Sequence, residues 1–175
     1  MTKIPYDYKD LFDMTIQRLK KEGLLLVTAD KSGKPNVMTI GWGTIGSVWG
    51  KNVFIVLIRP SRYSFTLLEQ FPQFTVNVPT PGLASEVAFC GSVSGRDCDK
   101  FAQTHLTPVP AQETDVPVIE QCPVNYQCKV IHKTDMVAGA VPDDIKKQFY
   151  PTDDYHRIYF GQILACYADE NLKLE

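Results

Sequence analysis

The order of hydrophobic and polar positions divides the chain into short strands joined by turns, with a few helices between them. Residues 8–22 carry apolar side chains near helical spacing, and Gly23 follows as a stop signal, which predicts an amphipathic first helix. Residues 24–29 (LLLVTA) are almost wholly apolar and predict a buried strand. Residues 52–59 (NVFIVLIR) form the clearest strand pattern in the chain.

Other segments continue this mixture of strands and helices. Further strands are predicted at residues 36–45, 73–78, 124–132 and 156–169, with short proline-punctuated strands over 107–120. Helices are predicted at residues 62–70, 83–93 and 94–101, and residues 135–155 are predicted to be an inserted excursion with a short helix. Strands that do not alternate regularly with helices predict an antiparallel barrel with helical decoration rather than a doubly wound parallel sheet.

Length and charge narrow the class of protein. The 175 residues predict one domain that spans residues 1–175. The net charge is −2, from 18 basic and 20 acidic residues, so there is no electrostatic case for nucleic acid or anionic lipid as the main partner. An anionic ligand would therefore have to be held by local cations and backbone N–H groups.

The location of the protein is predicted from its cysteines and apolar segments. No stretch approaches the roughly 20 apolar residues that span a bilayer, and the first residues lack the apolar core of a signal peptide. The five cysteines (Cys90, Cys98, Cys122, Cys128 and Cys166) are odd in number and contain no CxxC, which argues against a zinc site or a disulfide framework. We expect free thiols in a cytoplasmic protein, without a membrane partner.

Three segments carry unusual local chemistry. In residues 36–42 (NVMTIGW), polar and apolar side chains alternate near glycines, which can mark a close approach of a ligand, and Trp42 could flank a flat ring. On that segment alone, a bulged strand with a core tryptophan is the favoured interpretation. Residues 59–66 (RPSRYSFT) join a strand to a helix N-terminus with two arginines, which favours anion binding over simple capping by Ser61.

The third segment, residues 90–101 (CGSVSGRDCDKF), gathers small residues and two cations at another helix start. Its backbone N–H groups could form an anion-binding concavity. The alternative is a plain connection between two helices, in which Asp97 caps the second helix and Lys100 is solvated. Composition does not decide between these interpretations.

Together, these segments and the late strand HRIYFGQILA resemble the flavin reductase-like, FMN-binding split-barrel family, and in particular its flavoredoxin branch. The resemblance covers about residues 20–170 in the right order, with the SGRDCDKF stretch the most distinctive part. It implies a six-stranded antiparallel Greek-key split β-barrel that is mainly β with helices. It also implies a homodimer with FMN at the subunit interface.

The resemblance further implies a set of site residues. Asn36, Thr39, Ile40, Gly41 and Trp42 would contact the flavin ring, and His156 would lie near the flavin and the nicotinamide as the catalytic residue. The phosphate and ribityl chain would be bound by Arg59, Ser61, Arg62, Ser64, Thr66, Ser94, Gly95, Arg96 and Lys100. The chain departs from the family in having Asp154-Tyr155 before His156, where Gly-Asp is common, and in the length of residues 135–155.

The function implied is a flavoprotein oxidoreductase that uses NADH or NADPH to reduce flavin or another small acceptor. A flavoredoxin-like carrier that passes electrons between proteins is the first alternative, and a non-catalytic ligand-binding barrel is the second. Without the resemblance, His156 would be interpreted as a strand residue hydrogen-bonded to the neighbouring excursion.

Overall fold

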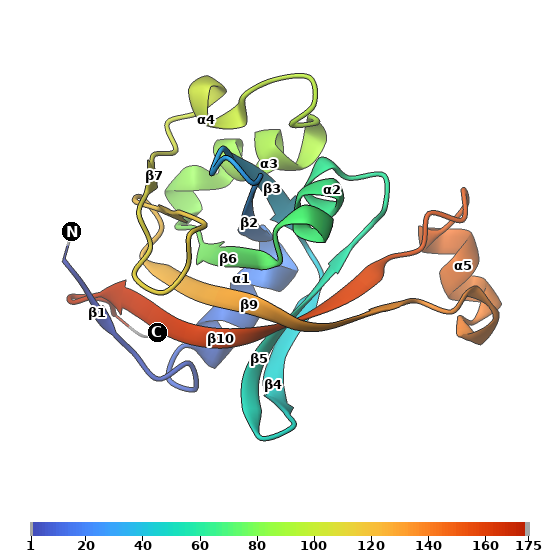
Figure 1. Ribbon diagram of the computed structural model, residues 1–175, viewed down its shortest axis with the longest axis horizontal. Helices are drawn as coiled ribbons and strands as arrows, with labels where there is room; N and C mark the ends of the chain where they lie inside the picture. The colour runs from blue at the N-terminus through green and yellow to red at the C-terminus, as the bar shows by residue number, and fades with distance from the viewer. Residues whose placement is uncertain (1, 174–175) are drawn as a thin grey trace.

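A computed structural model describes residues 2–173 of the chain (Figure 1). The strands are β1 (Lys3–Pro5), β2 (Leu24–Ala29), β3 (Pro35–Ile40), β4 (Gly43–Val48), β5 (Lys51–Ile58), β6 (Gln73–Val78), β7 (Pro108–Val109), β8 (Val118–Ile119), β9 (Val124–Asp135) and β10 (Arg157–Asp169). The α-helices are α1 (Phe12–Lys21), α2 (Tyr63–Gln70), α3 (Ala84–Ser92), α4 (Lys100–Gln103) and α5 (Asp143–Phe149), with single 3₁₀ turns at Pro81–Leu83 and Ala138–Ala140.

One antiparallel sheet of eight strands forms the body, in the order β3-β2-β6-β9-β10-β5-β4, with β1 paired to β10. β3 and β4 follow one another in the chain but lie at opposite ends of this order. The turn at residues 41–42 therefore joins the two edge strands of the sheet. Along its outer edge, β3 has backbone N–H and C=O groups that pair with no strand of residues 2–173.

The predicted strand over residues 36–45 is wrong as a single element, because the chain leaves β3 after Ile40 and enters β4 at Gly43. A Cβ atom at Gly43 would lie 2.7 Å from the carbonyl oxygen of Ile55, so this passage needs glycine. This division into two strands and the additional strand β1 give the sheet eight strands, whereas the family resemblance implies six. The predicted helix over residues 94–101 also starts later, since residues 95–97 form turns and α4 begins at Lys100.

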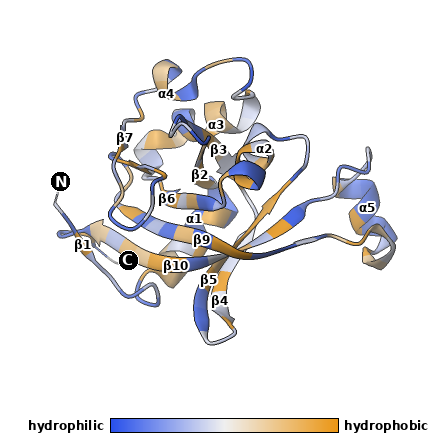
Figure 2. Ribbon diagram, in the orientation of Figure 1, coloured by the Kyte–Doolittle hydropathy of each residue, from blue (hydrophilic) through white to orange (hydrophobic). Residues whose placement is uncertain are grey.

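The core has two layers, one on each face of β2. Leu24 and Leu26 pack inside the barrel with α1 and the long strands, while Leu25 and Val27 pack outside against α3 and the loop before β9. Every residue of β2 is buried, as its apolar run predicts. Figure 2 shows hydrophobic and polar residues mixed along β9 and β10. Because α2 and α3 are held against β2 and β3 by this packing, the loops that flank them meet at the free edge of β3.

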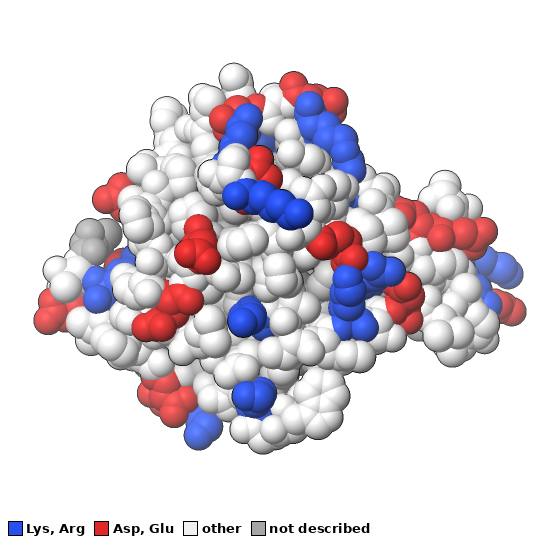
Figure 3. All heavy atoms as spheres, in the orientation of Figure 1, with Lys and Arg blue, Asp and Glu red and all other residues white. Residues whose placement is uncertain are grey.

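Residues 136–156, called the arm below, connect the ends of β9 and β10 and project from the body with α5 (Figure 1). The short helix predicted in this segment is α5. On the face in Figure 3, acidic and basic side chains are interspersed over the body and the arm. Among residues 2–173, no helix is long and apolar enough to cross a membrane.

Candidate functional site

A groove follows β3 from Lys34 to Trp42 and consists of three adjoining hollows. The central hollow, about 100 Å³, lies between β3, the start of α2 and the end of α3. The aromatic hollow, about 160 Å³, contains Trp42 and His156. The outer hollow, about 210 Å³, lies beside Arg96 and Asp97. Neighbouring hollows share side chains: Asn36 and Lys100 line the central and outer ones, and Met38 and Arg62 line the central and aromatic ones.

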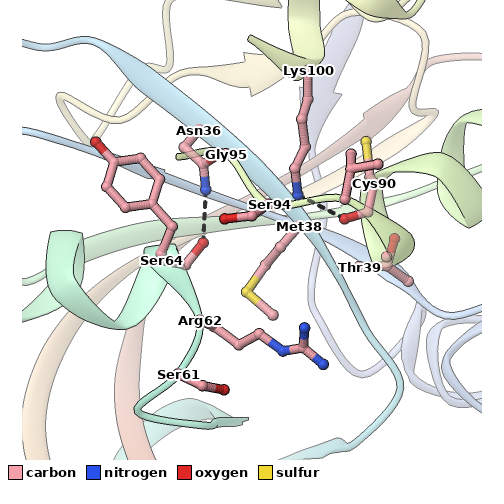
Figure 4. A pocket seen from close by; sticks show the side chains of 13 residues that line it. Asn36, Met38, Thr39, Ser61, Arg62, Ser64, Cys90, Ser94, Gly95 and Lys100 are labelled. Atoms are coloured by element: carbon pink, nitrogen blue, oxygen red, sulfur yellow. Dashed lines mark hydrogen bonds between the residues drawn. The ribbon is translucent and has the colours of Figure 1, made fainter. Parts of the chain in front are cut away.

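Two cations face the central hollow from different elements. Arg62 is the N-cap residue of α2; it is exposed, and its guanidinium has no hydrogen bond or ion pair to another described residue. Lys100, at the start of α4, is only 4% exposed, and its Nζ donates to the carbonyl oxygen of Cys90 at 2.8 Å. Figure 4 shows the two side chains reaching toward Met38 from opposite sides.

The buried Lys100 ammonium contradicts the alternative in which this lysine is solvated, and Asp99, not Asp97, caps the helix. Burial lowers the pKa of Lys100, because the cation loses hydration and no described carboxylate pairs with it. One of its three N–H groups caps the end of α3 through Cys90. The remaining donors are free for an anion in the hollow.

Asn36, Ser64 and Gly95 form one wall of the central hollow. The Asn36 amide Nδ2 donates to Ser64 Oγ at 2.9 Å, and both side chains are buried (Figure 4). A Cβ atom on Gly95 would lie 1.9 Å from Asn36 Oδ1, so any other residue here would displace the Asn36 amide or move the loop away from β3. The polar wall and the backbone of residues 94–95 therefore depend on one another.

Several of the predicted phosphate-binding residues also have side-chain partners in the arm or in the neighbouring loop. Arg59 donates to the carbonyl oxygens of Phe149 and Asp154, and Ser61 Oγ donates to Asp154 Oδ2 at 2.6 Å. Arg96 donates to the carbonyl oxygen of Ser61 and to the hydroxyl of Thr66. Arg59 and Ser61 thus attach the arm to the groove. Arg96 joins the two loops, and Thr66 lines none of the three hollows.

Aromatic side chains close the opposite end of the groove. Trp42 is 38% exposed, and its ring lies 4.9 Å from that of His156 and 5.0 Å from that of Phe149. This exposure contradicts the core tryptophan that residues 36–42 alone favoured. His156 is buried, and its Nδ1 lies 2.8 Å from the hydroxyl of Tyr150 in the arm. Thr39, Ile40 and Gly41 line the same hollow.

Burial, with the nearby Arg59 guanidinium as a second cause, lowers the pKa of His156 to about 4. His156 is therefore neutral at physiological pH. In the unfolded chain its pKa returns to about 6.5, so below that pH the unfolded state binds a proton that the folded state excludes. The stability that depends on neutral His156 is complete above pH 6.5 and is lost as the pH falls to about 4.

We expect the melting temperature of the wild-type protein to fall between pH 6.5 and 4 more steeply than that of His156→Gln, which cannot titrate. Differential scanning calorimetry at matched ionic strength measures both profiles. His105→Gln, which changes a histidine with no hydrogen-bonded side chain among the described residues, is the control. Parallel profiles for wild type and His156→Gln would contradict the buried neutral imidazole.

All five cysteines are free, as predicted, and four of them are buried. Burial raises the pKa of Cys90 to about 11 and that of Cys122 and Cys166 to about 12, and it also raises the pKa of Cys128 well above its usual value. These thiols are protonated and poorly nucleophilic at neutral pH. They contribute packing rather than chemistry.

The structure also adds groove residues that the sequence reasoning missed. Met38 separates the two cations, and the Tyr63 ring lies 5.3 Å from the Arg96 guanidinium. Both residues lie inside the motifs quoted above. The alternation of side chains along β3 could have indicated Met38, and the first position of α2 could have indicated Tyr63. Tyr150 lies in the arm, six residues from His156, and no sequence pattern pointed to it.

Fold and groove together define a class: the structure is that of an FMN-binding split barrel. It is similar to an FMN-binding domain of a flavin reductase-like enzyme from Shewanella baltica, with a TM-score of 0.69 at 18% identity over 96% of this chain and 78% of that one. It is also similar to the flavoredoxin of Desulfovibrio vulgaris (Miyazaki F), with a TM-score of 0.70 at 24% identity over 87% of this chain and 72% of that one.

The chain belongs to the flavin reductase-like domain family, whose sequence model matches residues 18–175. A protein of Archaeoglobus fulgidus is 33% identical over 102 residues, which make up 58% of this chain and 57% of that protein. The matched part thus spans little more than half of that relative. These findings confirm the predicted family and fold class.

Proposed function

We propose that this protein binds FMN in the groove along β3 and acts as an oxidoreductase, taking electrons from NADH or NADPH and passing them to flavin or another small acceptor. The observation that carries the proposal is the donor set of the groove. The central and aromatic hollows are lined by Arg59, Arg62 and Lys100 and by no acidic side chain of residues 2–173. A doubly charged phosphate tail suits this environment.

The residues present fit FMN in both chemistry and order along the groove. Arg62 and Lys100 would bind the phosphate, with N–H groups of the α2 N-terminus beside them. Asn36 and Ser64 offer hydrogen bonds for the ribityl chain, and Trp42 offers a ring face beside the isoalloxazine. When bound, FMN would supply the two-electron chemistry that these side chains lack.

We further propose that a second copy of the chain covers the outer face of β5 and β10, forming a homodimer. Ile55 pairs with Phe160 and Leu57 with Ile158 across these strands. The core residues Phe54, Val56 and Tyr159 alternate with them and point inward. An antiparallel sheet that faces water normally carries polar side chains there. Light scattering tests the dimer, and a monomer at micromolar concentration would contradict it.

The visible spectrum of the purified protein with added FMN is the experiment that tests the proposed function. Bound FMN, followed by anaerobic bleaching with NADH or NADPH, supports the reductase. Bound FMN that neither nicotinamide reduces, but that a protein donor does, supports the carrier instead. A protein that takes up no FMN would leave only a non-catalytic barrel.

A further inference from the structure

We propose that Tyr150 is a positioning residue that holds His156 as the tautomer protonated on Nε2, and so directs a neutral N–H donor into the aromatic hollow. The Tyr150 hydroxyl and His156 Nδ1 are 2.8 Å apart, and both side chains are buried. His156 lines the hollow together with Trp42. Its Nε2 has no hydrogen-bond partner among the described residues and is not one of their buried unpaired atoms, so it opens onto the hollow.

The direction of this hydrogen bond follows from the surroundings of Tyr150. The Arg59 guanidinium lies 5.0 Å from the centre of the Tyr150 ring. A cation there makes the phenol a better donor and its oxygen a poorer acceptor. Burial raises the pKa of Tyr150, so the hydroxyl keeps its proton at neutral pH. Tyr150 O–H therefore donates to Nδ1, which leaves the imidazole proton on Nε2.

The arm keeps Tyr150 in place. Its ring stacks on Tyr155 at 4.6 Å, and Arg59 ties the neighbouring backbone down through the carbonyl oxygens of Phe149 and Asp154. A donor fixed in this way remains neutral across physiological pH, because His156 does not titrate there. It can bind an acceptor atom that becomes more negative during reduction without exchanging a proton with solvent.

Long-range ¹H–¹⁵N NMR of the FMN-free protein, labelled at histidine, tests the tautomer at pH 7. His156 is assigned by the signal that His156→Ala removes from the spectrum of the three histidines. We expect a protonated Nε2 and a bare Nδ1 in the wild type, and a mixture of tautomers in Tyr150→Phe, which loses only the hydroxyl. Tyr155→Phe removes a hydroxyl from the stacked neighbour and should match the wild type.

A protonated Nδ1 in the wild type, or an unchanged tautomer in Tyr150→Phe, would overturn the proposal. Its consequence for catalysis rests on the proposed function. There, Tyr150→Phe should slow flavin reduction by the nicotinamide about 2- to 10-fold with FMN retention and KM unchanged. It should have no further effect when His156 is already alanine. Failure of the wild type to bind FMN would refute the proposed function, while the NMR result would still decide the role of Tyr150.

Discussion

Arg62→Ala combined with Lys100→Met is expected to lower the affinity for FMN by about 100- to 10,000-fold, because each of the two charge-assisted contacts to the phosphate contributes about 1.5–3 kcal/mol. Methionine keeps the apolar stem of the buried lysine and removes the ammonium. Fluorescence titration of FMN measures the loss, and the difference from wild type should shrink at high salt. Riboflavin, which has no phosphate, should bind the variant and the wild type about equally.

Lys20→Ala combined with Lys51→Ala is the matched control, because it removes the same net charge at two exposed positions outside the groove. FMN affinity should stay at the wild-type value. Loss of the Lys100 cap could also destabilise α3, so Arg62→Ala is tested alone as well. Arg62 is exposed, and its guanidinium makes no hydrogen bond to another described residue. Wild-type affinity in Arg62→Ala and in the double variant would refute the phosphate assignment.

Gly95→Ala is expected to weaken FMN binding by about 10-fold and to destabilise the fold by about 1–3 kcal/mol. The added Cβ would lie 1.9 Å from Asn36 Oδ1 and 3.0 Å from Tyr63 Cδ1. Either the Asn36 amide leaves Ser64 and rotates, or the loop moves away from β3. Both changes take donors out of the groove wall. Thermal unfolding and FMN titration measure the two effects.

Gly46→Ala is the control for Gly95→Ala, because its Cβ would meet no atom within 4 Å. A second comparison isolates the cause. In an Asn36→Ala background the clashing amide is gone, so Gly95→Ala should cost much less stability than it does in the wild type. If Gly95→Ala is as well tolerated as Gly46→Ala, the close approach of the loop to β3 has no role in the site.

Local patterns were enough to predict most strands of this fold. The apolar run of residues 24–29 and the alternation of residues 52–59 depend only on burial, which a single segment reveals. The break between β3 and β4 at residues 41–42 was not predicted, because residues 36–45 are rich in strand-forming residues on both sides of it. The break arises from the close approach of Gly43 to the Ile55 carbonyl, a contact between segments that no local pattern encodes.

The sequence predicted which types of residue line the groove, but it did not predict the hydrogen-bond partner of each one. The sequence placed Arg59, Arg62 and Arg96 near helix starts, where all three could bind phosphate. The structure directs Arg59 to the arm and Arg96 to the neighbouring loop, whereas the Arg62 guanidinium has no partner among the described residues. The partner of each guanidinium depends on which carbonyl oxygens the tertiary fold brings near it. The Tyr150–His156 hydrogen bond was beyond prediction for the same reason.

A crystal structure of the protein with FMN tests the central claim most directly. We predict electron density for the phosphate within hydrogen-bonding distance of Arg62 and Lys100, and for the flavin ring between Met38 and Trp42. A phosphate held elsewhere, or a groove that stays free of FMN at saturating concentration, would contradict the claim that these two cations anchor the flavin.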